Sequence, residues 1–236
     1  IEQGIPPLGT PDFRAGVIDI PVTAQTAFLP KGRLHQGYIQ SWNFTVERQL
    51  PGAVVVDVAY VGTGTVRSYA NWDQNAGFPG SGNARRPLSV KYGRAVDTNL
   101  LDGLVNSNYH SLQMSVNRRY TNGLYLKGAY TFSKALNMQD GSGSDAGGTT
   151  LGWNHLSVFS RNYGLAGYDR RHNLQMSWSY ELPFGPGKKW MARGGVASAV
   201  GRDWQINGLF SSYTGTPFTV SAAGASLDAP RNNQTA

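Results

Sequence analysis

The chain has 236 residues, of which 40% are hydrophobic, 11% aromatic and only 15% charged. Soluble domains usually carry about 25% charged residues. The difference is made up here by Gly, Ser, Thr, Asn and Gln, a mixture that suits a structure with one wet face and one face against apolar material. The length allows one large domain or two small ones. The absence of cysteine excludes disulfides, cysteine-based metal sites and cysteine nucleophiles.

The net charge is +7, but the basic residues are scattered and form no single stripe, so we expect no nucleic-acid partner. Pairs such as Arg118-Arg119 flank expected strands, as charges do where a strand leaves a membrane for water. No apolar run approaches the roughly 18 residues of a membrane helix. The first residues lack the basic and apolar regions of a signal peptide. We expect both ends to be cuts through a longer chain.

Two strands joined by a tight turn open the regular part of the sequence. Residues Tyr38–Gln49 alternate apolar and polar side chains with period two, the pattern of a strand with unlike faces. The dipeptide Pro51-Gly52 predicts a turn. Residues Ala53–Val61 predict the second strand, with Val54, Val56, Val58 and Tyr60 on one face and Asp57 and Ala59 on the other.

Four further strands follow the same pattern. Residues Tyr109–Tyr120 and Leu124–Ser133 predict a hairpin closed by Asn122-Gly123, a strong two-residue turn signal. Residues His172–Glu181 and Trp204–Tyr213 predict the fifth and sixth strands.

The connections between these strands alternate in length. The polar stretch from Gly62 to about Ser107 and the segment from Lys134 to about Arg171 predict long loops, whereas the first and third strands end in tight turns. Consecutive antiparallel strands end alternately at opposite edges, so one edge collects turns and the other collects loops. Outer-membrane barrels are built in this way, with short periplasmic turns and long extracellular loops.

The sequence therefore predicts an all-β fold: a segment of an antiparallel up-and-down transmembrane β-barrel with long loops. Strands of about ten residues match a tilted crossing of the bilayer. Bacterial barrels begin at about eight strands, so six to eight strands are expected to be a fragment of a larger barrel. The alternative is a soluble β-sandwich on the cell surface that binds carbohydrate or serves in adhesion, with the apolar face in an internal core. Tyr and Trp near the strand ends favour the barrel, since these rings gather at membrane interfaces.

Several stretches resemble one family, the TonB-dependent receptors of the acidobacterial, Oar-like type. They are Ser41–Gln49, Val58–Gly62, Asn108–Gln113, Gly128–Lys134, Asp169–His172, Tyr180–Gly185 and Ser212–Phe218. The resemblance implies a barrel of about 22 strands around an N-terminal plug and transport of a bulky substrate driven by TonB. The plug, the TonB-contacting segment and the terminal aromatic strand are absent from this sequence, so we expect the chain to supply wall and loops.

Candidate contact residues lie in the expected extracellular loops. Basic side chains there could bind phosphates of lipopolysaccharide, because guanidinium and ammonium groups bind phosphate well; the favoured interpretation is ordinary solvated charge. Aromatic loop residues could contact a substrate or pack within the loops. The candidate contacts are Arg67, Trp72, Arg85, Arg86, Trp153, Arg161, Tyr163, Arg170 and Arg171, with Lys91, Arg94, Lys134 and Phe159 as further loop-side residues.

The sequence indicates no enzyme, metal or cofactor. The four histidines show no metal-binding spacing. The run Asp169–His172 has no accompanying nucleophile elbow, and a role in pairing strands at the rim is expected for it. Asp140 and Asp145 lie among glycines without EF-hand spacing, which favours a flexible loop.

The predicted organisation has three parts. Residues 1–35, rich in Pro and Gly, predict irregular structure with a short strand near Ala15–Ile20; residues 36–220 predict the partial barrel; and residues 221–236 predict a loop remnant. The expected location is the outer membrane, and the expected partners are its lipid, its lipopolysaccharide and, through other parts of the natural protein, the TonB system.

Overall fold

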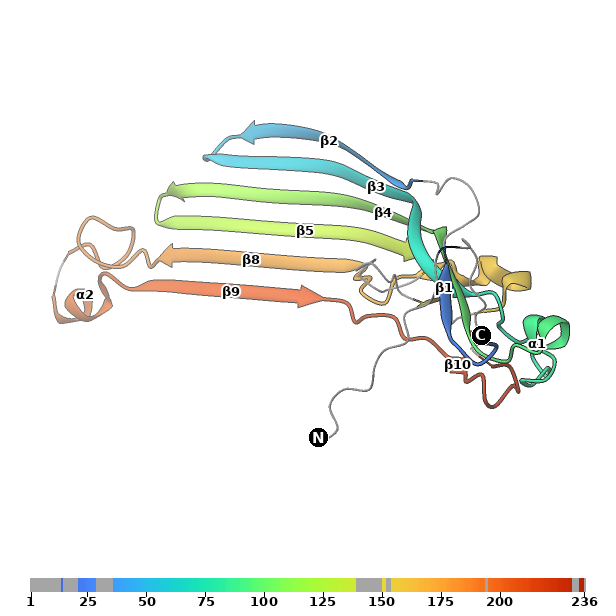
Figure 1. Ribbon diagram of the computed structural model, residues 1–236. Coiled ribbons are helices and arrows are strands. Elements are labelled where there is room, and N and C mark those ends of the chain that lie inside the picture. The colour runs from blue at the N-terminus through green and yellow to red at the C-terminus, as the bar shows by residue number, and fades with distance from the viewer. Residues whose placement is uncertain are drawn as a thin grey trace.

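The computed structural model describes residue 14 and residues 21–28, 36–138, 150–151, 154–193, 195–230 and 234–235. Six long strands form one antiparallel sheet in the order β2-β3-β4-β5-β8-β9, so that each strand pairs with its neighbour along the path (Figure 1). Their bounds are β2 Tyr38–Leu50, β3 Val54–Asp73, β4 Thr98–Thr121, β5 Leu124–Asn137, β8 His172–Glu181 and β9 Gln205–Tyr213. This up-and-down order confirms the predicted topology.

Shorter elements attach at the two ends of the sheet. At the end away from the tight turns, β1 (Thr26–Phe28) runs parallel to β4, β6 (Thr150–Leu151) runs parallel to β3, and β7 (Gly164–Leu165) runs antiparallel to β5. The pair β10 (Ser221–Ala222) and β11 (Gln234–Thr235) forms a separate two-stranded sheet.

Three short helices complete the described structure: α1 (Pro87–Tyr92), the 3-10 helix η1 (Leu156–Asn162) and α2 (Val196–Gly201). Figure 1 shows α2 beside the tight turns, and α1 and η1 at the opposite end. Among the described residues, none of the helices has both the length and the apolar character needed to cross a membrane.

Both predicted hairpin turns are present. Leu50 pairs with Val54 across Pro51–Ala53, where Gly52 and Ala53 have φ of 83° and 60°. Thr121 pairs with Leu124 across Asn122 and Gly123, whose φ values are 52° and 75°. In this second, two-residue turn, positive φ at both central residues is the type I′ conformation, which suits the twist of a hairpin.

The predicted loop from Gly62 to Ser107 is wrong in its extent. Strand β3 continues to Asp73 and β4 begins at Thr98, so the loop between them covers only residues 74–97. The extension was not visible in the sequence because the loops cover both faces of the hairpin here, as the burial of Ala70 and Asn71 on opposite faces shows. The two faces then no longer differ as apolar and polar, so the alternation is lost while the backbone hydrogen bonds persist. Similarly, β5 extends to Asn137, which shortens the next loop.

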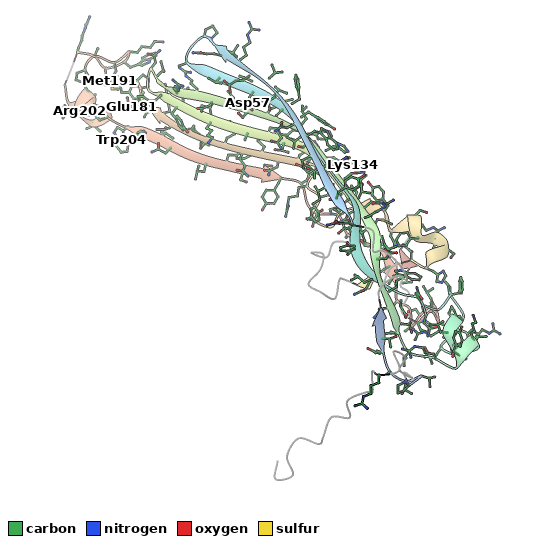
Figure 2. The ribbon with its side chains drawn as sticks, turned by 45° about the horizontal axis from the view of Figure 1, so that its top comes forward. Asp57, Lys134, Glu181, Met191, Arg202 and Trp204 are labelled. Atoms are coloured by element: carbon green, nitrogen blue, oxygen red, sulfur yellow. The ribbon has the colours of Figure 1, made fainter. Side chains whose placement is uncertain are left out.

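A register shift marks the start of the extension. The β3–β4 register shifts between Thr65 and Ser68, where Arg67 has φ of 57° and its backbone N–H donates to Asn106 Oδ1 at 3.0 Å. A β-bulge of this kind bends a strand and increases its twist. In Figure 2 the long strands bend toward the loops, with Lys134 labelled near the bend.

The long sheet is a single layer. Every residue of β2 is exposed, and large apolar side chains elsewhere on the sheet remain open, including Leu209 at 88% exposure. The hydrophobic cluster lies at the loop end, where Ala70, Val105 and Met138 pack with Trp72, Leu104, Phe159 and Tyr163. A β-sandwich would bury one face of the sheet beneath a second sheet, and no such layer exists among the described residues.

Candidate functional site

The loops at one end of the sheet pack together, and most of the predicted contact residues lie there (Figure 1). We call this part the loop head and define it as residues 74–97, the described part of 138–171, and residues 221–230. Backbone N–H groups of Gly77, Gly80 and Gly82 donate to carbonyls of Pro230, Leu227 and Asp228, at 3.0, 2.7 and 2.8 Å. The segment predicted as a loop remnant therefore packs along the loop between β3 and β4.

Arg86 lies at the centre of the loop head and is only 4% exposed. Its Nη2 contacts Asp73 Oδ2 at 2.6 Å and Asp97 Oδ1 at 3.0 Å. Its remaining donors reach the carbonyls of Asn75 and Ala95, each at 2.6 Å. An external phosphate could bind this guanidinium only by displacing these partners.

Asn75 completes the same network and is fully buried. Its side-chain amide donates to the carbonyls of Arg94 and Val96, and its Oδ1 accepts from the backbone N–H of Leu88 in α1. Asp73 Oδ1 accepts from the N–H groups of Asn75 and Thr98. The network thus joins the ends of β3 and β4 to α1, with its buried polar groups hydrogen-bonded as a stable interior requires.

The other predicted residues in the loop head or beside it divide into engaged and exposed side chains. Trp72 packs on the hydrophobic cluster, and Tyr163 Oη accepts from Asn108 Nδ2 at 2.7 Å. Arg85 and Arg161 are exposed. Trp153 lies outside the described residues.

The predicted rim residues lie where β5 meets the start of β8. Asp169 is buried, and its Oδ1 accepts from the backbone N–H of Ala135 at 2.6 Å. Arg170 stacks over Tyr213 with Cζ 4.4 Å from the ring centroid, and its Nη1 donates to Thr214 O at 3.0 Å. Arg171 is exposed. Asp169 and Arg170 therefore hold neighbouring segments together at the rim.

His155 joins two parts of the loop head. Its ring lies 3.9 Å from that of Phe78, centroid to centroid. Its Nδ1 accepts from the backbone N–H of Ser157 at 3.2 Å, which caps the first turn of η1. Burial lowers the pKa of His155, because desolvation disfavours the charged ring.

A second group of residues, which the sequence reasoning did not single out, lies on the sheet itself. On one face of the sheet, Tyr60 Oη and His110 Nδ1 are 2.7 Å apart, and Tyr130 Oη and His172 Nδ1 are also 2.7 Å apart. Both pairs are stacked, with interplanar angles of 17° and 27°. The two arrangements repeat the same contact on β3–β4 and on β5–β8.

An internal repeat in the sequence could have revealed these pairs. His110-Ser-Leu-Gln-Met-Ser115 and His172-Asn-Leu-Gln-Met-Ser177 share five of six residues, and Ala-Tyr precedes each at positions 59–60 and 129–130. Alternation along a single strand does not show this repeat; comparison of one strand pair with the next does.

The face that carries these pairs is apolar over most of its length. The cross-strand row Val46, Val58, Met114, Tyr130 and Leu174 runs across it. At one edge of this apolar face Trp42 lies over Gly62, where a Cβ atom would clash with the indole, and its ring reaches His110 at 6.0 Å between centroids.

The opposite face is polar. Glu47 pairs directly with Asp57, which accepts a short hydrogen bond from Ser115 Oγ on the next strand. A hollow of about 460 Å³ on this sheet is lined by Lys127, Ala129, Gln175, Met176, Ser177, Leu209, Phe210 and Ser211. Within the described residues there is no group of three His, Cys, Asp or Glu side chains that could hold a metal ion.

These features define the class of protein. A sheet with one apolar and one polar face, tight turns at one end and long loops at the other has the construction of an outer-membrane barrel wall. The family model for an outer membrane beta barrel domain matches residues 1–236, so the chain belongs to that family and its location is the outer membrane. No curated protein and no solved structure matches the chain.

Proposed function

We propose that this chain forms part of the barrel wall and the extracellular loops of a TonB-dependent transporter for a bulky substrate. The observation that carries the proposal is the asymmetry of the sheet: three-residue and two-residue turns at one end, and at the other a loop head supported by strands that continue past the apolar face. Large extracellular structures on a wide barrel suit the capture of a substrate too large for an open pore.

The polar face supplies the transport path in this proposal. Its side chains are mainly neutral hydrogen-bonding groups, and the charged exceptions include Glu47, Asp57, Lys127 and Glu181. A face of this kind remains hydrated and binds a passing solute weakly. The role is one of transport, and no catalytic step is part of it.

Exposed residues of the loop head are the proposed contacts for the substrate. Arg85 and Arg161 are open to solvent, and Arg171 is exposed at the rim. The buried network around Arg86 holds the loop between β3 and β4 in one conformation, so that these contacts are presented without a large ordering cost.

The test uses the complete natural protein in its own host. Outer-membrane fractionation is expected to recover it with the membrane, and comparison of the culture medium between the host and a gene deletion is expected to show a compound that is consumed only when the gene is present. Consumption that continues in a TonB-deficient host would contradict TonB dependence. Recovery of the protein in the soluble periplasm would overturn the barrel assignment itself.

A further inference from the structure

We infer that the apolar face binds the phosphate group of a phosphorylated outer-leaflet glycolipid, the lipid A part of lipopolysaccharide, through His110, Lys134 and His172. We call these three residues the boundary site. The inference rests on the chain forming an outer-membrane wall, as the proposed function requires, but not on TonB-driven transport.

The strand register brings the three side chains together on one face. His110 on β4 lies directly opposite Lys134 on β5, and Phe132, two residues from Lys134, lies opposite His172 on β8. Lys134 and His172 are therefore diagonal neighbours. Directly opposed Cβ atoms are about 5 Å apart and diagonal ones about 7–8 Å, so these long side chains converge within reach of a single phosphate group.

The height of the boundary site matches the outer edge of the hydrocarbon layer. On β4 the apolar residues Leu112, Met114 and Val116 separate His110 from Arg118, the next cationic residue on this face. Eight residues span about 27 Å along a strand, or about 21 Å across the membrane at a tilt near 40°. An outer-membrane apolar band is about 25 Å tall, and the boundary site lies on its loop-side edge, where lipid phosphates lie.

The donors of the boundary site are available to an external ligand. His110, Lys134 and His172 are all exposed. A tyrosine hydroxyl engages Nδ1 of each histidine, which orients the ring and leaves Nε2 for an outside partner. When the hydroxyl donates to Nδ1, Nε2 carries the ring proton and can donate to a phosphate oxygen. For the described residues no hydrogen bond or ion pair occupies the Lys134 ammonium.

Aromatic rings lie beside the boundary site, as Trp42 does in the cross-strand row of His110, and one row further into the apolar face, as Tyr60 and Phe132 do. Trp42, Tyr60 and Phe132 are between 41% and 44% exposed on the same face. Rings at this depth contact acyl chains and ester groups beneath a phosphate. The combination of cations at the edge and aromatic rings below them fits a phosphorylated lipid better than a free anion.

The loop arginines fit this ligand less well. Arg86 is buried between two carboxylates, and Arg94 donates to Thr98 Oγ1 and to the Pro21 carbonyl. Arg170 is stacked on Tyr213 and hydrogen-bonded to Thr214. Lys134, in contrast to these arginines, is exposed and lies on the apolar face itself.

The test is a binding titration of the complete natural protein, purified in micelles and freed of lipid. The probe is bisphosphorylated lipid A, and bound lipid is counted by native mass spectrometry. Replacing Lys134→Gln together with His110→Gln and His172→Gln is expected to weaken binding about tenfold or more, the loss that follows removal of charged hydrogen bonds. The matched control is Arg48→Gln, an exposed cation on the same face at the opposite edge, which is expected to leave binding unchanged.

Lipid chemistry provides a second measurement that needs no variant. Enzymatically dephosphorylated lipid A is expected to bind the unmodified protein about tenfold more weakly, and equal binding of the two lipids would overturn the inference. An equal loss of lipid A binding in Arg48→Gln would show that the phosphate does not bind specifically at the boundary site. Full displacement of lipid A by millimolar inorganic phosphate would show a free-anion site instead. Failure of these tests in a protein that fractionates with the outer membrane leaves the proposed transport function standing.

Discussion

At the scale of single residues, the loop head is held by polar contacts more than by apolar burial. The side chain of Arg86 has five donors and a planar shape, and it joins two carboxylates and two carbonyls in the space between β3, β4 and α1. Breaking such a buried ion pair by removing one partner is strongly destabilising, since the remaining charges are left desolvated.

Replacing Arg86→Met is therefore expected to destabilise the loop between β3 and β4 by about 3–5 kcal/mol. The measurement is limited proteolysis of residues 74–97 on intact outer membranes, where the variant should be cut much faster. The neighbouring exposed residue supplies the control, because Arg85→Met should leave the cleavage rate nearly unchanged. Equal protection of both variants would show that the buried ion pairs do not hold this loop.

His155 predicts a pH dependence in the same loops. Its pKa is lowered by burial, so the folded state binds fewer protons than the unfolded state between the lowered pKa and the ordinary value of 6.5. Stability therefore rises with pH in that window, is fully present above 6.5, and is lost as the pH falls below it. Protonation also removes the Nδ1 lone pair that accepts from Ser157.

The expected outcome is faster amide hydrogen exchange in η1 at about pH 5 than at about pH 8, after correction for the intrinsic pH dependence of exchange. The variant His155→Gln should lose most of this difference, because it removes the titrating ring. A pH response of the same size in that variant would assign the effect to another group.

At the scale of elements, the sequence predicts strands well wherever the two faces of a strand meet different surroundings. The six long strands were placed correctly because alternation between apolar and polar side chains continues across the membrane. The outer part of β3, from Gly62 to Asp73, does not show this alternation, because loops pack on both of its faces and bury apolar and polar side chains alike, such as Ala70 and Asn71. The engaged role of Arg86 was equally hidden, because its carboxylate partners are 11 and 13 residues away in the sequence and meet only through strand pairing.

The β4–β5 turn allows a test at this scale. Gly123 has φ of 75°, and a Cβ there would lie 3.2 Å from Cβ of Glu181. Gly123→Ala is therefore expected to reduce the free energy of unfolding by about 1–2 kcal/mol, measured by denaturant titration in lipid vesicles. Gly215→Ala is the control, since nothing lies within 4 Å of its Cβ position and its φ is ordinary. Equal losses of stability in the two variants would show that the conformation of the β4–β5 turn is not the cause.

The two faces of β4 allow a second test. Met114 lies near mid-height on the apolar face, whereas Gln113 points to the polar face, where it contacts Ser111. Met114→Arg is expected to cost about 2–4 kcal/mol, the penalty for a charge at the bilayer midplane of a barrel. Gln113→Arg should cost much less in the same vesicle unfolding measurement. A reversed order would mean that the faces are assigned the wrong way round.

At the scale of the whole molecule, the sheet is a wall without a closed edge. Strands β2 and β9 stand at its two ends and pair with only one neighbour each among the six long strands. Unpaired backbone groups in hydrocarbon are costly, so barrels close. Large apolar side chains such as Phe44, at 69% exposure, also require lipid or another apolar surface around the sheet.

The isolated 236-residue chain is accordingly expected to show no cooperative unfolding transition in aqueous buffer. Circular dichroism during urea titration provides the measurement, with the complete natural protein in micelles as the control that unfolds cooperatively. A soluble, monomeric and cooperatively folded fragment would instead favour the surface-module interpretation of the sequence.

The continuation of β3 beyond the apolar face has a consequence for what the cell presents to its surroundings. Gly62 to Asp73 are 12 residues of β3, about 36 Å from the first Cα to the last before correction for tilt and for the bend at the bulge. In the proposed orientation, a hairpin of that length is expected to carry α1 into the sugar layer at the cell surface. If the loops face outward, as we propose, antibodies and bacteriophages that cannot reach the bilayer are expected to meet this tip first, so residues 74–97 are the expected epitope on an intact cell.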